Sequence, residues 1–101
     1  MKLWIDDVRP APKGYYWVWS VNEAKLEIEW FETEEDEPFE LIDIDYDAGD
    51  FAITGGGDYI KLLDWLEETG RNYPIHIHSQ NVVGVENMRR IIKRNGWKEI
   101  K

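Results

Sequence analysis

The chain has 101 residues, 43% of them hydrophobic, and contains no cysteine. This length suffices for one compact domain over residues 1–101, and the lack of thiols excludes a disulfide, a zinc–thiolate site and a cysteine nucleophile. The net charge of −9 argues against nonspecific binding of long DNA or RNA, because such binding depends on neutralising phosphates. No apolar run is long enough for a bilayer, and Asp6 and Asp7 interrupt the N-terminal apolar stretch before a signal-peptide core forms. We therefore expect a soluble, cytoplasmic protein with no membrane partner.

The first part of the chain predicts two strands and a helix. Residues 2–5 form a short apolar run that ends at two aspartates, which indicates a strand. The segment from Val8 to Gly14 contains prolines and a glycine, so it cannot form a regular helix. Residues 15–20 are aromatic and β-branched, which predicts a second strand. Ser20 and Glu23 then form a capping box that begins a helix, which ends in the acidic stretch 32–38.

The second part continues the alternation of strands and helices. The pattern predicts a strand at 39–45, a glycine-rich loop at 46–57, a helix at 58–69, a strand at 73–79, a helix from about 84 to 95 and a short strand at 97–100. The loop has no lysine in a P-loop position, so it is not expected to cradle a nucleoside triphosphate. Alternation of this kind predicts an α/β fold with a parallel sheet covered on both faces and right-handed crossovers.

Polar residues follow the carboxyl ends of these strands, where ligands bind in such sheets. They are Asp6, Asp7, Asp45, Asp47, His78, Ser79 and Asn81. Side chains alternate along a strand, so Asp43 and Asp45 share one face, and the two histidines share a face of the next strand. If these strands are neighbours in register, we expect Asp43 beside His76 as a buried, structural pair. We expect Asp45 beside His78 at the mouth of the site.

The residues near the predicted site suit two kinds of chemistry. His78 belongs to the residue type that titrates near neutral pH and suits proton transfer, whereas His76 fits a satisfied core histidine. The carboxylates of Asp6, Asp7 and Asp45 would repel one another unless a cation lies between them, and an all-oxygen site suits Mg²⁺. Helix capping, or a solvated group of loop acids, is the alternative for these aspartates.

Basic residues gather near the end of this acidic chain. Such a patch could hold a small anion, although a solvated helix face is the alternative. The residues are Arg89, Arg90, Lys93, Arg94, Lys98 and Lys101.

The motifs LWIDD, IDID and HIHS resemble the landmarks of the response-regulator receiver domain: an aspartate pair after strand one, an aspartate after strand three and a hydroxyl after strand four. Three departures stand out. The segment after Asp7 cannot form the first helix, the chain stops before a final helix, and the receiver lysine has only Lys101 as a weak match.

A closer resemblance covers nearly the whole chain. The blocks LWIDDVRPAP, DYDAG, GGDYIKLLDWLEE and HIHSQNVVGVENMRR are similar to those of the cyclic-phosphate processing receiver-like domains, with Val82 where that family usually has proline. The resemblance implies a three-layer receiver-like (flavodoxin-like) α/β fold with a four- or five-stranded parallel sheet. The implied strand order is 2-1-3-4(-5), with the first helix absent or reduced.

The same resemblance implies roles for individual residues. Those for catalysis are Asp45, Asp47 and His78; those for substrate binding are Arg9, Ser79, Asn81, Asn87 and Arg90; those for a metal are Asp6, Asp7 and Asp45. The implied activity is processing of 2′,3′-cyclic phosphate ends or related cyclic nucleotides, in RNA repair or phage–host conflict. The implied ligand is therefore a small phosphate compound or an RNA end.

Three hypotheses follow from these residues. The first is Mg²⁺-assisted phosphodiester hydrolysis with His78 moving the proton, or with Asp45 attacking phosphorus directly to give a covalent intermediate. The second is a binding module that sequesters a cyclic nucleotide or meets a protein partner without catalysis. The third, an aspartyl-phosphate signalling switch, is disfavoured by the missing lysine and missing output elements.

Overall fold

The computed structural model describes all of residues 1–101 and contains one five-stranded parallel sheet. The strands are β1 (Lys2–Ile5), β2 (Tyr15–Val18), β3 (Leu41–Ile44), β4 (Ile75–Ile77) and β5 (Glu99–Ile100), in the order β2-β1-β3-β4-β5. The helices are α1 (Val21–Thr33), α2 (Phe51–Thr54), α3 (Ile60–Glu68) and α4 (Val82–Asn95). The predicted α/β class, strand direction and strand order are confirmed.

Local capping explains where the helices begin. The Ser20 hydroxyl accepts from the backbone N–H of Glu23 at 3.1 Å, as predicted, and the Glu23 carboxylate accepts from the N–H of Trp19, one residue before the N-cap position of a standard capping box. The α4 helix begins two residues before its predicted start because the Asn81 side chain caps it, accepting from Gly84 N–H at 2.9 Å. The short α2 helix lies in the segment predicted as loop.

The hydrophobic core lies between the sheet and its helices. Alternate strand residues are fully buried on this side, as expected for a sheet with one face packed on helices. The helices contribute apolar residues at helical spacing. The core includes Leu3, Ile5, Ile42, Ile44 and Ile75 from the sheet, Ala24 and Ile28 from α1, Leu62, Leu63 and Leu66 from α3, and Met88 and Ile92 from α4.

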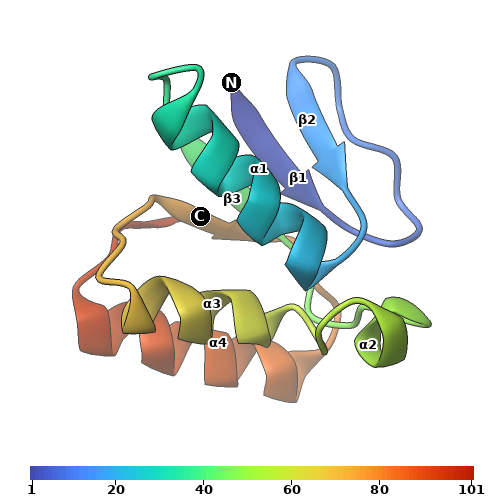
Figure 1. Ribbon diagram of the computed structural model, residues 1–101. Helices are drawn as coiled ribbons and strands as arrows, with labels where there is room; N and C mark the ends of the chain where they lie inside the picture. Colours follow the sequence, from blue (N-terminus) through green and yellow to red (C-terminus); the bar gives the residue numbers. More distant parts are fainter.

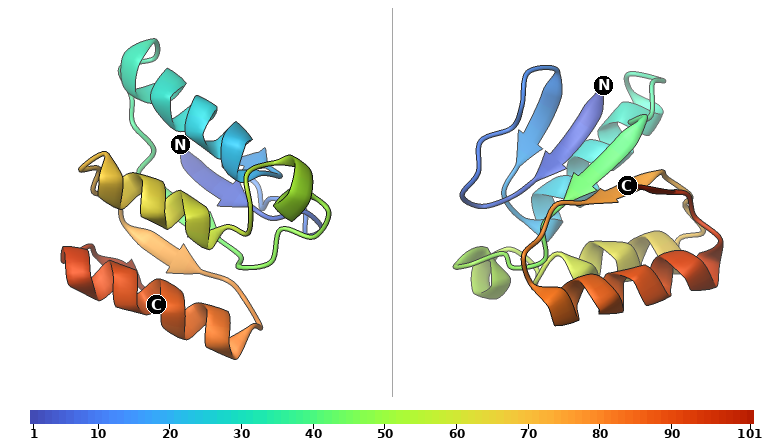
Figure 2. Two further views of the ribbon diagram at one scale, coloured as in Figure 1. Left: turned by 60° about the horizontal axis from the view of Figure 1, so that its bottom comes forward. Right: turned by 180° about the vertical axis from the view of Figure 1, so that it is seen from behind.

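The helices occupy one face of the sheet. The α1 helix lies in front of the strands in Figure 1 and behind them in the reversed view of Figure 2, while α3 and α4 run side by side below. Each long helix lies in a crossover between two strands: α1 between β2 and β3, α3 between β3 and β4, and α4 between β4 and β5. These three crossovers run in the same direction across the sheet. Because such crossovers are right-handed, all three helices lie on the same face of the sheet.

The second face of the sheet carries a loop where a helix was expected to cover it. The loop between β1 and β2 is fixed to the sheet by two indole N–H groups: Trp4 donates to the carbonyl of Arg9 and Trp17 to that of Asp6, each at 2.8 Å. With no helix between β1 and β2, and none after α4, the expected third layer is not formed. None of the helices has the length and apolar character of a membrane span.

Candidate functional site

Neighbouring strands β3 and β4 place an aspartate beside a histidine, as the alternation predicted. Asp43 and His76 are register partners, and His76 Nδ1 lies 2.8 Å from Asp43 Oδ1. Asp43 is buried, with 5% of its side chain exposed, whereas 33% of the His76 side chain is exposed. The predicted pair is therefore confirmed, but it is buried on one side only, because no helix covers this face of the sheet.

His78 bridges two buried carboxylates. Its Nδ1 lies 2.6 Å from Asp43 Oδ1, and its Nε2 lies 3.0 Å from Asp6 Oδ2. The imidazole of His78 is therefore in hydrogen-bond contact at both of its nitrogens, with a carboxylate from β3 at one and with the carboxylate that follows β1 at the other. The side chain of His78 is only 9% exposed, so these two contacts are held largely out of water.

The expected pairing of His78 with Asp45 is corrected by these contacts. Asp45 lies one residue beyond the end of β3, and its Oδ1 accepts from the backbone N–H of Tyr46 at 2.7 Å. The nitrogens of His78 are instead taken by Asp43 and Asp6. Asp45 stays near, since one ligand atom from each of Asp6, Asp45 and His78 lies within 4.8 Å of the others.

A tryptophan positions the His78 ring. Trp4 on β1 stacks on the imidazole with ring centroids 3.8 Å apart and planes 4° apart. Trp4 is a register partner of Asp43 and therefore lies on the same face of the sheet. The sequence analysis did not single out Trp4. The signal was available, because strand alternation places Trp4 on the face that also carries the carboxylate two residues later.

Asp6 joins His78 to the loop that follows β1. Its Oδ1 accepts from the backbone N–H groups of Val8 at 2.8 Å and Arg9 at 2.9 Å, an arrangement typical of aspartate in a turn. The residue is 1% exposed, and each of its carboxylate oxygens has a partner. The backbone of Arg9 is thus fixed, while its side chain is exposed and makes no ion pair.

Carboxylates crowd the carboxyl edge of the sheet next to this bridge. Burial raises the pKa of Asp7 above its usual range, and the negative charges of Asp6, Asp45 and Asp47 raise it further. A side chain at Gly49, which has a positive φ of 56°, would overlap the Asp7 carboxylate. The glycine therefore lets the loop after β3 close tightly over Asp7.

This crowding fits a hard divalent cation. The group whose ligand atoms lie within 4.8 Å of one another is Asp6, Asp45 and His78, and the predicted ligand Asp7 is not in it. Both nitrogens of His78 are already in contact with carboxylates, so the oxygens of Asp6 and Asp45 are the ligands that this group would offer a hard cation. Asp45 Oδ2 makes no hydrogen bond, and the pKa of Asp7 is raised first by burial and then by the neighbouring negative charges, which a cation would neutralise. The oxygen donors present fit Mg²⁺.

The loops after β3 and β4 meet beside the carboxylates. Asn81 Nδ2 lies 3.3 Å from Asp47 Oδ2, and the Ser79 hydroxyl accepts from the backbone N–H of Asn81 at 3.2 Å. Asn81 therefore both caps α4 and contacts the acidic edge. In this way the structure brings together the site residues predicted from three separate strand ends.

Two residues with predicted binding roles lie away from this cluster. Arg90 Nη1 donates to Asn87 Oδ1 at 3.0 Å, one turn apart on α4, and Arg90 is exposed. Neither side chain contacts the carboxylates or His78. Asn87 lies in the second turn of α4 and Arg90 in the third, away from the strand ends.

Comparison with protein families matches residues 1–94 to the Cyclic-phosphate processing Receiver domain. The chain belongs to this family. Comparison with curated proteins and with solved structures finds no match. The receiver domain thus has the aspartates after β1 and β3 and the hydroxyl after β4 in the places that the resemblance of its motifs implied.

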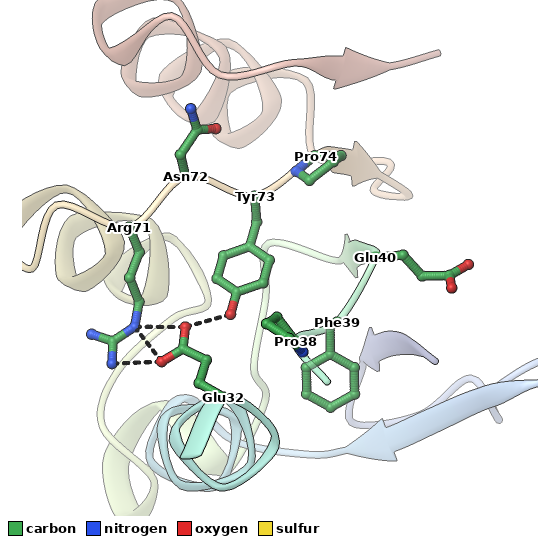
Figure 3. A pocket seen from close by; sticks show the side chains of 8 residues that line it. All are labelled: Glu32, Pro38, Phe39, Glu40, Arg71, Asn72, Tyr73 and Pro74. Carbon is green, nitrogen blue, oxygen red and sulfur yellow. Dashed lines mark hydrogen bonds and ion pairs between the residues drawn. The ribbon is translucent and has the colours of Figure 1, made fainter. Parts of the chain in front are cut away.

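The receiver domain has a second polar cluster at the amino ends of its strands, far from the site. Figure 3 shows a cavity of about 450 Å³ in which Arg71 and Tyr73 both bond to Glu32. Arg71 makes three hydrogen bonds to this carboxylate, at 2.9 to 3.1 Å. These polar groups satisfy one another, which makes this end a structural clasp between α1 and the segment before β4.

Proposed function

We propose that this receiver domain hydrolyses a cyclic phosphate on a nucleotide or an RNA end with the help of a divalent cation. The observation that carries the proposal is the bridge Asp43–His78–Asp6, which joins a proton-carrying ring to the carboxylate edge of the sheet. Ligands of parallel α/β sheets bind at this edge. The family to which the chain belongs is described as processing cyclic phosphates, which suggests this class of substrate.

In this proposal, oxygens of Asp6, Asp7 and Asp45 hold the cation. When bound, the cation would polarise a phosphoryl oxygen and offset the negative charge that develops in the reaction. The closed turn at Gly49 keeps Asp7 in place, and the N–H of Tyr46 orients Asp45. These contacts fix the carboxylates before a ligand arrives, which lowers the cost of assembling the site.

His78 moves the proton at Nε2, while Asp43 holds Nδ1 and Trp4 holds the plane of the ring. An oriented carboxylate–imidazole pair is a common arrangement for general acid–base catalysis. Water adds across one P–O ester bond of the ring phosphate, and the departing sugar oxygen receives a proton. For water or the sugar oxygen to reach Nε2 of His78, the hydrogen bond between Nε2 and Asp6 Oδ2 must break when the substrate binds.

Residues of the surrounding loops bind the phosphate. Arg9 is suited to this role because its backbone is fixed by Asp6 and its guanidinium, free of ion pairs, presents a planar fork to phosphate oxygens. Ser79 and Asn81 supply polar groups from the β4 loop, and Asp47 orients Asn81. Direct attack by Asp45, with a phosphoryl-enzyme intermediate, is the alternative route, and Asp45 Oδ2 is free for it.

A binding module that holds a cyclic nucleotide without cutting it is the second candidate. One observation favours it: both nitrogens of His78 are engaged and the side chain is 9% exposed, as expected of a structural histidine. In that case the bridge would only stabilise the site. The two candidates make different predictions for the phosphate ester.

Phosphorus NMR separates these candidates. The protein is mixed with 2′,3′-cyclic mononucleotides and a cyclic-phosphate-ended oligonucleotide, with Mg²⁺ or with chelator, beside Asp45→Asn and His78→Ala. We expect Mg²⁺-dependent conversion to a monophosphate that both variants lose and that Asp36→Asn retains. Asp36 is an exposed control with the same charge change, and its positive φ suits asparagine. Unchanged spectra with ligand still bound would reject hydrolysis in favour of the binding module.

A further inference from the structure

Two adjoining cavities form a groove that runs from the β4 loop along α4. The first, of about 320 Å³, is lined by Ile77, Ser79, Val82, Val85, Glu86 and Arg89. The second, of about 250 Å³, is lined by Glu86, Arg89, Arg90 and Lys93. The two cavities share Glu86 and Arg89, so they adjoin at these residues. One end of this groove lies at Ser79, next in the chain to His78.

The helical residues of the groove recur at the spacing of one α-helical face. Each of positions 82, 85, 86, 89, 90 and 93 lies three or four residues from another of the set, which places their side chains in a single stripe along the helix. At about 1.5 Å per residue, the stripe is about 16 Å long. A stacked nucleic-acid strand rises by about 3.4 Å per nucleotide, so the stripe matches a few nucleotides.

The lining changes from apolar to basic with distance from the site. Near Ser79, Val82 is 72% exposed and presents an apolar surface to a ligand in the groove. Further along, Lys93 has no ion pair or hydrogen bond. Arg90 bonds Asn87 through one nitrogen, and Arg89 bonds Glu99 through Nε alone, so both guanidinium groups keep free donors.

We propose that this groove binds single-stranded RNA next to the reacting end, so that an oligonucleotide binds more tightly than a free cyclic mononucleotide. The inference rests on the proposed function, because the reacting phosphate sets where the strand begins. Val82 and Val85 pack against a sugar or base, and Arg89, Arg90 and Lys93 contact the phosphates that follow. All three were predicted from the sequence to belong to a basic patch that could hold a small anion, and the family resemblance implied a substrate-binding role for Arg90.

The charge of the rest of the molecule favours a thin, flexible strand over a larger acidic partner. The chain carries a net charge of −9, so an extended anionic surface would be repelled outside the groove. Within the groove, three cations face one carboxylate, Glu86. A single strand can follow the groove and keep its distance from the acidic surface, whereas a broad acidic protein cannot.

The test measures binding of fluorescent hexauridylate with an ordinary 3′-hydroxyl end, which cannot be hydrolysed by cyclic-phosphate chemistry. The groove variant is Arg89→Gln with Lys93→Gln. Its matched control is Arg94→Gln with Lys61→Gln, which removes the same charge. The control breaks two ion pairs, those of Arg94 with Glu67 and of Lys61 with Asp64, whereas the groove variant breaks one, that of Arg89 with Glu99. Lys93→Gln alone, which breaks no ion pair, is the second variant and guards against misfolding.

We expect the groove variant to bind hexauridylate about tenfold more weakly at about 0.15 M salt, with a salt slope shallower by about 1.4 for two lost contacts. Lys93→Gln alone should reduce the slope by about 0.7. The matched control should bind as the original chain does. Binding of 2′,3′-cyclic uridine monophosphate should stay unchanged in all variants.

Hexauridylate binding that is absent, or equal in the original chain and the groove variant, would overturn the proposal. So would an equal loss in the matched control, or binding of hexaglutamate in preference to hexauridylate. Failure of the proposed function is a separate result: cyclic ends would not be hydrolysed, while the groove variant would still weaken hexauridylate binding.

Discussion

His78 owes its position to three contacts with two neighbouring strands and with the residue that follows β1. Asp43 and Asp6 take its nitrogens, and Trp4 lies flat against the ring. Hydrogen bonds to charged groups are worth about 1.5–3 kcal/mol each, so the two carboxylates dominate over the stacking contact. Trp4 therefore mainly fixes the plane of the His78 ring, while the two carboxylates provide most of the stabilisation.

Replacing Trp4 by leucine should free the plane of the His78 ring. Loss of the ring current should move the His78 ring-proton NMR signals downfield, while Trp4→Phe should restore part of the upfield position. The signals of His76 serve as the internal control, because that ring stacks on no tryptophan. Unchanged His78 signals in Trp4→Leu would show that the stack is not kept in solution.

Asp7→Asn should stabilise the protein when no divalent cation is present. Burial and neighbouring carboxylates raise the pKa of Asp7, so its ionised form is unfavourable in the folded state at neutral pH. The contribution is on the order of 1 kcal/mol, which raises the Tm by a few degrees in a domain of this size. Thermal melts with chelator measure this.

With Mg²⁺ present, the original chain should become more stable than Asp7→Asn. Added Mg²⁺ should raise the Tm of the original chain and have little effect on Asp7→Asn, because a ligand that binds only the folded state stabilises it. The control is Asp64→Asn, a carboxylate on α3 outside the site. An equal rise in all three proteins would argue against a specific cation site at Asp7.

Sequence alternation predicts contacts between register partners but not contacts that reach along the sheet. The pair of Asp43 with His76 follows from the period of two residues and was predicted. The second bond of Asp43, to His78, spans two register positions and depends on the rotamers of both side chains. Asp6 reaches His78 from beyond β1, which no local pattern encodes.

At the scale of elements, α1 is joined to the chain before β4 by the clasp of Glu32, Arg71 and Tyr73. Burial alone would raise the pKa of Glu32, but the hydrogen bonds from Arg71 and Tyr73 outweigh it, so the pKa is lowered. The Arg71 guanidinium also stacks on Trp65, 4.3 Å from the ring centroid. The clasp closes the end of the core opposite to the site.

Stability should decrease in acid through this clasp. A carboxyl with a lowered folded-state pKa stabilises the protein above its unfolded value of about 4.5, and this contribution is lost as pH falls through the lower folded value. Glu32→Gln should therefore cost about 2 kcal/mol at neutral pH and much less near pH 3, as measured by urea unfolding. Glu29→Gln, exposed on the same helix, should cost little at either pH.

The α4 helix approaches the loop after β3 so closely that only glycine fits at position 84. A Cβ there would overlap the ring of Tyr46. Gly84→Ala should displace Tyr46 and with it Asp45, whose carboxylate accepts from the N–H of that residue. We expect a net loss of at most about 2 kcal/mol, since alanine favours the helix by about 1 kcal/mol, but a large loss of Mg²⁺ or nucleotide binding.

Val83→Ala is the control for that substitution, because Val83 lies on the same turn and is 68% exposed. Calorimetric titration would measure both variants. Normal binding by Gly84→Ala would show that the Tyr46 loop adapts without moving Asp45.

Most elements could be predicted because their signals are local. Capping by Ser20 and the apolar spacing of α1 are in the sequence, and so are the strand positions of the apolar runs. The start of α4 was missed because the capping bond comes from Asn81, two residues earlier than the apolar periodicity indicates. The α2 helix has no buried residue and therefore no periodic signal.

At the scale of the molecule, the number of layers could not be read from the alternation of strands and helices. Strand order depends on long-range pairing, and the family resemblance supplied it. Helices cover a face only where the crossovers on that face contain them. Here the crossovers on one face contain helices, whereas the β1–β2 connection on the other face is a loop. The β1–β2 loop and the aromatic side chains below it replace the second helical layer.

Net charge should make stability depend on salt. With a charge of −9, self-repulsion favours the unfolded chain, and monovalent salt screens it. We expect the Tm to rise between low salt and about 0.3 M sodium chloride. Mg²⁺ at matched ionic strength should raise it further, which separates screening from binding. A Tm that falls with salt would show that the ion pairs of the protein outweigh its self-repulsion.

The loop after β1 is closed by the same carboxylate that holds His78. Because Asp6 receives the amide protons of Val8 and Arg9, those protons exchange with solvent only when Asp6 releases them. A ligand that draws Asp6 away from His78 also loosens this loop, so the two events belong to one cooperative opening. The exchange rate of these two amide protons therefore measures how often the Asp6 contacts open.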